Sequence, residues 1–174
     1  MITLMNNIDL KQFTPILVVL NEEGSAKEWI SPHVHIHTLG GVRVRSSFFL
    51  LKKKLKELNP DAVVTTMTHS NCLVMALKPF FPDTKFIIRE AVIPTTTLLE
   101  NKRFSFVIKI LYKCLYPYAD LVLSPSQDII DEFRSKIGID ISNHKTLYNQ
   151  VDFQKIQSQM GPSTIKDQNI MTFT

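Results

Sequence analysis

Polar side chains that could bind or react with a ligand follow three apolar runs of the chain, each at the point where a predicted strand ends. They are Thr68, His69, Asn71, Arg89, Glu90 and Ser126. A histidine titrates near neutrality and can polarise a hydroxyl group, whereas a guanidinium pairs with phosphate and a carboxylate accepts from sugar hydroxyls. These types predict binding of a phosphate or a sugar, with His69 and Glu90 as the candidate catalytic groups.

Each candidate also has a purely structural explanation, which the sequence leaves open. His69 could pack at a strand end, and Arg89 with Glu90 could form a local ion pair that ties its loop to a neighbouring helix. Ser126, with Ser124, could cap the helix that follows. Asp61 and Asp120 stand at strand starts, on the opposite edge, where a structural role is expected.

The elements that position these residues alternate between strands and helices. Short β-rich runs predict strands at 15–20, 33–39, 61–66, 85–91, 119–124 and 145–149. Helical spacing predicts helices at 42–58, 70–80 and 101–116, and a further helix that Pro125 opens in its first turn and Gly138 ends. Between the strand at 85–91 and the helix at 101–116, Pro94 and three threonines predict a polar loop. This order predicts a doubly wound α/β fold with a parallel sheet, whose ligands bind beyond the carboxyl ends of the strands.

Composition narrows the partners without choosing among them. The chain has 174 residues, 20 Lys plus Arg and 16 Asp plus Glu, for a net charge of +4. This favours anionic partners, including an anionic membrane surface for the basic and aromatic helix at 101–116. No run of the sequence is long and apolar enough to be a transmembrane helix. Cys72 and Cys114 are predicted to be reduced core residues, and the alternating His33, His35 and His37 favour an exposed strand face over a metal site.

Four segments in order resemble the N-terminal, acceptor-side domain of a GT-B glycosyltransferase of the family 4 type. They are LKKKLKELNPDAVVTTMTHSN, KFIIREA, YPYADLVLSPSQDIIDEF and HKTLYNQVDFQKI. The first is similar to the family's helix, strand and histidine-bearing loop. The last resembles its passage towards a second domain. The resemblance implies a Rossmann-like domain at 1–156, and an interdomain linker with the start of a nucleotide-sugar domain at 157–174.

The resemblance also implies a mechanism and its partners. A sugar would move from a nucleotide sugar, held through a second domain, to a polysaccharide or lipid-linked acceptor, without a metal or another cofactor. The family's first strand and its glycine-rich loop have no counterpart here, and neither has its donor site. The chain alone is therefore expected to be inactive and to need a partner chain or to aggregate.

Other functions remain in competition with this one. A truncated, non-catalytic module that binds a membrane or a partner is one alternative, and a fragment of a sugar-nucleotide epimerase is another. Nucleic-acid binding is disfavoured because no stripe of aromatic and basic residues lies on the predicted strands. A cytoplasmic location is expected, at the inner face of the cell membrane if the membrane contact forms.

Overall fold

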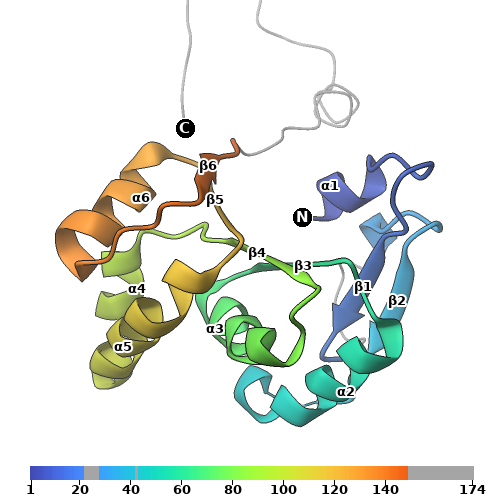
Figure 1. Ribbon diagram of the computed structural model, residues 1–174, viewed down its shortest axis with the longest axis horizontal. Coiled ribbons are helices and arrows are strands. Elements are labelled where there is room, and N and C mark those ends of the chain that lie inside the picture. Colours follow the sequence, from blue (N-terminus) through green and yellow to red (C-terminus); the bar gives the residue numbers. More distant parts are fainter. Residues whose placement is uncertain (22–27, 42, 149–174) are drawn as a thin grey trace, which may run out of the picture.

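The fold is described from a computed structural model, which places residues 1–21, 28–41 and 43–148 (Figure 1). Residues 22–27, 42 and 149–174 lie outside this description, and so does the predicted segment 157–174. The strands are β1 (Ile16–Val19), β2 (His35–Thr38), β3 (Ala62–Thr66), β4 (Lys85–Arg89), β5 (Leu121–Ser124) and β6 (His144–Thr146). The α-helices are α1 (Ile2–Asn6), α2 (Phe48–Leu58), α3 (Thr68–Leu77), α4 (Pro94–Glu100), α5 (Ser105–Leu115) and α6 (Gln127–Glu132).

The predicted fold class is confirmed. Strands β3, β4, β5 and β6 form an all-parallel sheet in that order, and helices flank it (Figure 1). Strands β1 and β2 pair in parallel as a separate two-stranded sheet. The β-strands of the described chain are therefore divided between two sheets, whereas the sequence predicted one.

Burial differs sharply between the inner and the edge strands. Phe86 and Ile88 of β4 and Val122 of β5 are fully buried, as expected for the interior of a parallel sheet. Val64 of the edge strand β3 is 41% exposed, and Ile16 of β1 is 36% exposed. The core therefore centres on β4 and β5 and thins towards β1 and β3.

Helix α2 and its approach follow local side-chain chemistry. Leu51 and Leu55 are buried on its inner face, as the spacing predicts. The helix begins at Phe48, and not at residue 42, because a separate 3₁₀ turn (Val44–Ser46) precedes it. The hydroxyl groups of Ser46 and Ser47 donate to the carbonyl of Arg43, which holds that turn. Asn59, in the left-handed conformation with φ 43°, ends the helix.

Two predictions between β4 and β5 are wrong. The predicted polar loop at Pro94 is helix α4, and the predicted single helix at 101–116 begins only at Ser105, after a 3₁₀ turn (Lys102–Phe104). Pro94 suits a first helical turn because its fixed φ is preorganised and its missing N–H costs nothing there. The hydroxyl group of Thr95 donates to Glu132 over 2.7 Å, so a tertiary contact compensates for the weak helix propensity of threonine.

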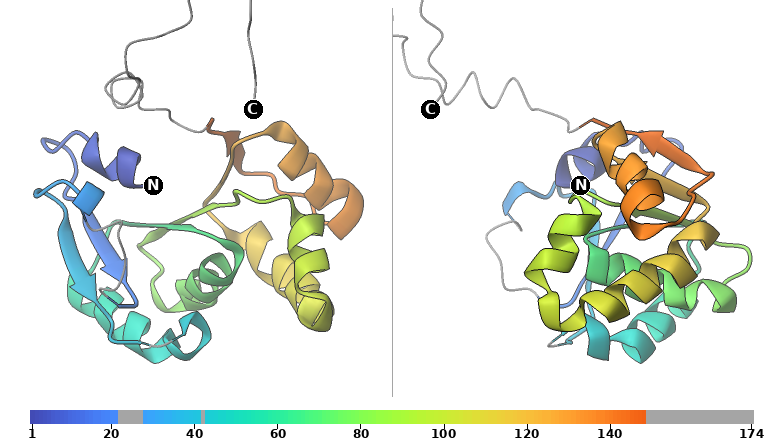
Figure 2. Two further views of the ribbon diagram at one scale, coloured as in Figure 1. Left: turned by 180° about the vertical axis from the view of Figure 1, so that it is seen from behind. Right: turned by 90° about the vertical axis from the view of Figure 1, so that its left-hand side faces the viewer.

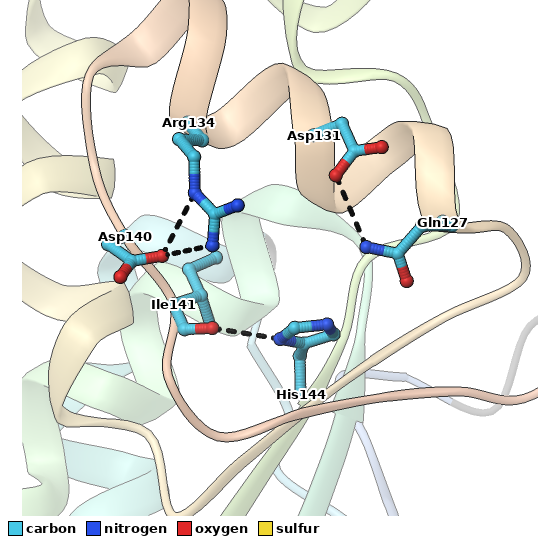
Figure 3. A network of polar contacts seen from close by, with 6 residues as sticks. All are labelled: Gln127, Asp131, Arg134, Asp140, Ile141 and His144. Atoms are coloured by element: carbon cyan, nitrogen blue, oxygen red, sulfur yellow. Dashed lines mark hydrogen bonds and ion pairs between the residues drawn. The ribbon is translucent and has the colours of Figure 1, made fainter.

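The last strand is reached through a short helical run and a surface network. Gly138, in the left-handed conformation with φ 78°, ends the π-helical turn Phe133–Ile137, as predicted. Figure 3 shows Arg134 donating twice to Asp140 and the His144 ring beside the Ile141 carbonyl. The ring Nδ1 and that carbonyl oxygen are 2.9 Å apart. These contacts hold the segment that leads into β6, although the exposed Arg134–Asp140 pair contributes little to stability.

The predicted role of Asp120 is confirmed, and that of Cys114 is wrong. The Asp120 carboxylate accepts from the Phe86 N–H over 2.8 Å and from Lys78 over 2.5 Å, so it ties β5 to its neighbours. Cys72 is buried as predicted, whereas Cys114 lies on the exposed side of α5. The neighbours of Cys114 explain this, since α5 turns Ile108 and Tyr112 towards the core instead.

Candidate functional site at the carboxyl ends of the strands

The predicted gathering of polar residues at one edge is confirmed. In the sheet register Thr66 lies beside Arg89, Arg89 lies beside Leu123, and the next residue, Ser124, lies beside Thr146. Strands β3, β4 and β5 therefore end at the same edge. The residues that follow them share this rim, which we define by Thr68, His69, Asn71, Arg89, Glu90 and Ser126.

A strained turn joins β3 to α3. Met67 has φ 77° and ψ 131°, a conformation that a residue with a side chain rarely adopts. Its carbonyl accepts the first helical hydrogen bond, from the Asn71 N–H over 2.9 Å. Helix α3 therefore begins at Thr68, two residues before the predicted start, and His69 lies in its first turn and not in a loop. The turn fixes His69 at the rim with its side chain exposed.

Glu90 lies at the centre of a buried hydrogen-bonded cluster, although a charged side chain is rarely buried. Thr68 Oγ1 donates to its Oε1 over 3.2 Å, and Tyr116 Oη donates to its Oε2 over 2.5 Å. Asn71 Nδ2 lies 3.4 Å from the same Oε2 and donates to the Arg89 carbonyl over 3.0 Å. We call Thr68, Asn71, Glu90, Tyr112 and Tyr116 the Glu90 cluster.

The two tyrosines of the cluster come from one face of α5 and the turn that follows it. Tyr112 and Tyr116 are four residues apart, and both are fully buried. Their rings contact each other edge to face, with centroids 4.7 Å apart, and both contact Phe133. Tyr112 Oη lies 3.2 Å from Thr68 Oγ1. The tyrosines therefore connect α5 to the start of α3 and to the end of β4.

Burial governs the ionisation of this cluster. It raises the pKa of Glu90, against the opposing effect of the hydrogen bonds from Tyr116, Thr68 and Asn71. Burial, together with the Glu90 charge, also raises the pKa values of Tyr112 and Tyr116. The pKa of the Cys72 thiol rises to about 12 for the same reasons, so this cysteine is not a nucleophile at neutral pH.

The rim residues therefore divide into an inner and an outer group. Thr68, Asn71 and Glu90 are buried and contact one another, whereas His69 is exposed and Arg89 and Ser126 are partly exposed. Ser126 is the N-cap of α6, but its hydroxyl group makes no capping bond. Instead its carbonyl accepts from Ser124 Oγ over 2.8 Å. Pro125 precedes this cap, so it does not lie in the first turn as predicted.

Sequence reasoning did not find Tyr112, Tyr116 or the strained Met67. The signal for the tyrosines was present, since two phenols one turn apart on an apolar helix need buried hydrogen-bond partners. Nothing in the sequence marks Met67, because glycine or asparagine is the usual residue at positive φ.

The described residues form no metal site at the rim, and two hollows of the described surface lie away from it. Within residues 1–21, 28–41 and 43–148, no three His, Cys, Asp or Glu side chains gather as a metal site. Two open hollows lie elsewhere, one beside α4 and α5 and one between β2 and α2. No described helix is long and apolar enough to cross a bilayer.

Comparison with known proteins finds a glycosyltransferase. Over 122 residues, or 70% of this chain, the sequence is 27% identical to a Campylobacter jejuni enzyme. That protein is N-acetylgalactosamine-N,N'-diacetylbacillosaminyl-diphospho-undecaprenol 4-alpha-N-acetylgalactosaminyltransferase. The match covers 33% of the relative's length. No known protein-family model matches the chain. The similarity and the parallel α/β sheet together support a glycosyltransferase-like domain.

Proposed function

We propose that this chain is the acceptor-side domain of a GT-B glycosyltransferase of the family 4 type. The observation that carries the proposal is the similarity to a transferase over 70% of the chain. The complete enzyme would move a sugar from a nucleotide sugar to a lipid-linked or polysaccharide acceptor. The relative's name specifies a diphospho-undecaprenol acceptor, so a lipid-linked diphosphate is the acceptor class we favour.

The outer rim residues supply the contacts in this proposal. His69, exposed in the first turn of α3, would accept or share the proton of the acceptor hydroxyl group. Arg89 would pair with a phosphate or a sugar hydroxyl, and Ser126 would contribute a hydroxyl at the start of α6. The buried residues Thr68, Asn71 and Glu90 would hold the outer rim residues in position. The predicted catalytic role of Glu90 stays a prediction, and its burial favours a positioning role.

The domain organisation follows from the same proposal. Residues 1–156 would form the Rossmann-like domain, and 157–174 would begin the domain that binds the nucleotide sugar. The reaction would take place in the cleft between two such domains, at the cytoplasmic side of a membrane. No cofactor enters the proposed mechanism.

Transfer by the complete enzyme, in which this domain is joined to a domain that binds the nucleotide sugar, tests the proposal. The assay follows radiolabelled sugar from a set of nucleotide sugars into a short-chain polyprenyl-diphosphate sugar. Replacing His69 by Ala should lower kcat/KM about a hundredfold or more, the usual contribution of a general acid or base. His35→Ala is the matched control, since His35 is also exposed but lies on β2, a strand of the separate sheet.

The possible outcomes distinguish the alternatives. Absence of transfer by the wild-type protein with every donor would overturn the proposal, and an unchanged rate for His69→Ala would remove His69 from it. An epimerase would interconvert the nucleotide sugar without an acceptor. A non-catalytic module would bind the acceptor and leave the donor intact.

A further inference from the structure

Helix α5 carries an apolar and basic outer face. Ile108 and Tyr112 turn towards the core, whereas Phe106 is 75% exposed, Val107 51% and Ile110 43%. Phe106, Lys109, Ile110 and Lys113 follow the i, i+3, i+4, i+7 spacing of a single helical stripe. No acidic residue lies between Ser105 and Leu115. The exposed side of this helix thus combines large apolar side chains with positive charge.

The same character continues into the preceding turn. Phe104 is exposed with the Arg103 guanidinium 5.8 Å from its ring centre, and Lys102 lies beside it in the chain. Four cations, Lys102, Arg103, Lys109 and Lys113, stand against one anion, Glu100, which leaves a local charge of +3 (4 − 1). Between α4 and α5 an open hollow of about 380 Å³ is lined by Leu98, Leu99, Lys102, Ser105, Phe106 and Lys109.

Nothing else among the described residues covers this face. Figure 2 shows α4 and α5 on the outer side of the domain, in front of the sheet in its right-hand view. We define the α4–α5 surface by Lys102, Phe106, Val107, Lys109, Ile110 and Lys113. An exposed apolar patch of this kind marks an interaction site.

We propose that the α4–α5 surface docks the protein on an anionic lipid bilayer. Phe106, Val107 and Ile110 would enter the boundary between headgroups and acyl chains, while the lysines extend to the lipid phosphates. The choice of a bilayer rests on charge, since positive side chains surround the apolar ones and α5 itself carries no acidic residue. The inference names the membrane contact for the proposed function and rests on it, because a lipid-linked acceptor would reside in that bilayer.

Flotation of the full chain with vesicles tests the surface. The vesicles are equimolar phosphatidylglycerol and phosphatidylcholine, with pure phosphatidylcholine for comparison. The wild-type chain should bind the anionic vesicles and lose binding as the salt concentration rises. Lys109→Gln with Lys113→Gln should weaken partitioning about 30-fold, since each basic residue near an anionic surface is worth roughly a fivefold change. Phe106→Ser should weaken it roughly tenfold through lost apolar burial.

Matched variants on α2 control for net charge and for general stickiness. Lys53→Gln with Lys56→Gln removes the same charge, and Phe49→Ser removes a phenylalanine that is 79% exposed. These should leave partitioning within about twofold of wild type, because α2 is not in the proposed contact. Lys109→Arg with Lys113→Arg keeps the charge and should retain binding. Equal losses from the α2 and α5 pairs, or no binding to anionic vesicles at low salt, would overturn the proposal. A wild-type dimer that Phe106→Ser dissociates, without vesicle binding, would assign the surface to a second copy instead.

The transfer assay separates this inference from the function on which it rests. If both hold, the α5 variants keep the wild-type rate on a short-chain, water-soluble acceptor and lose rate only on a long-chain acceptor in vesicles. Transfer without vesicle binding would overturn the surface alone. Vesicle binding with the expected α5 losses, but no transfer to either acceptor, would support the surface and overturn the proposed function.

Discussion

The Glu90 cluster and the α4–α5 surface depart from the usual distribution of polar and apolar groups in opposite directions. Both are built on α5. The inner side of α5 and the turn after it carry two buried tyrosines: Tyr116 donates to the Glu90 carboxylate, and Tyr112 contacts the Thr68 hydroxyl group. The outer side of α5 carries three exposed apolar residues, Phe106, Val107 and Ile110. A helix selected for stability alone would present mostly polar side chains to solvent. The comparison therefore indicates that folding alone does not explain the outer side of α5.

The two regions also differ in how their side chains are satisfied. Inside, hydrogen bonds among Thr68, Asn71, Glu90 and Tyr116 offset the cost of burying polar groups. Outside, Phe106, Val107 and Ile110 keep much of their apolar surface exposed to solvent. Mutations should consequently cost stability in the first region and binding in the second.

The largest expected loss comes from Glu90→Leu. This change leaves the Thr68 and Tyr116 hydroxyl groups without their carboxylate acceptor, in a site with little access to water. We expect the free energy of unfolding to fall by about 3 kcal/mol or more. Denaturant unfolding followed by circular dichroism measures it, with the exposed Glu100→Leu as control. Wild-type stability in the Glu90 variant would show that these hydrogen bonds contribute nothing net.

Tyr116→Phe should have a smaller effect of the same sign. It removes one hydroxyl group and keeps the ring contacts with Tyr112 and Phe133. The expected cost is about 2 kcal/mol, as for a hydrogen bond to a chargeable group. Tyr118→Phe is the control, because Tyr118 is exposed. A double-mutant cycle with Glu90→Gln should give a coupling energy above about 0.5 kcal/mol, and additive losses would contradict the contact.

The raised pKa of Glu90 predicts a pH dependence of stability. The folded state binds the Glu90 proton more tightly than the unfolded state does, so this group contributes fully below its ordinary pKa. The contribution is lost as the pH rises through the raised value. The free energies of unfolding of wild type and Glu90→Gln, measured from about pH 4 to about pH 8, should diverge in favour of the variant at high pH. A constant difference across this range would contradict the raised pKa.

The sequence predicted which residues lie at the sheet edge better than it predicted the buried hydrogen bonds of the Glu90 cluster. Apolar runs such as DAVVTT and KFII fix where strands end, and parallel strands end together, so Thr68, His69 and Arg89 could be placed on one rim. The end of the helical run at Gly138 could also be predicted, because the left-handed conformation at a helix end favours glycine.

The remainder depended on contacts between distant segments. Helix α4 could not be predicted because its threonines are weak helix formers, and a contact from Thr95 to Glu132 of α6 supports it. The partners of Glu90 come from α3 and from the turn after α5, 19 to 26 residues away in the chain. Which side of α5 faces inwards was equally open, because the helix is apolar on both. The structure shows the tyrosines on the inner side, where their hydroxyl groups have buried hydrogen-bond partners.

The smallest expected change in stability is that of Phe106→Ser. Because this side chain is exposed on the α4–α5 surface, the free energy of unfolding in solution should stay within about 0.5 kcal/mol of wild type. Phe133→Ala is the contrasting variant: its ring contacts Tyr112 and Tyr116 in the core, and its loss should cost about 3 kcal/mol or more as a fully buried phenylalanine. Thermal denaturation of both variants measures the difference. A loss of about 2 kcal/mol for Phe106→Ser would mean that the ring packs against the protein. A negligible loss, together with weakened vesicle binding, would instead show that the outer side of α5 serves recognition and its inner side stability.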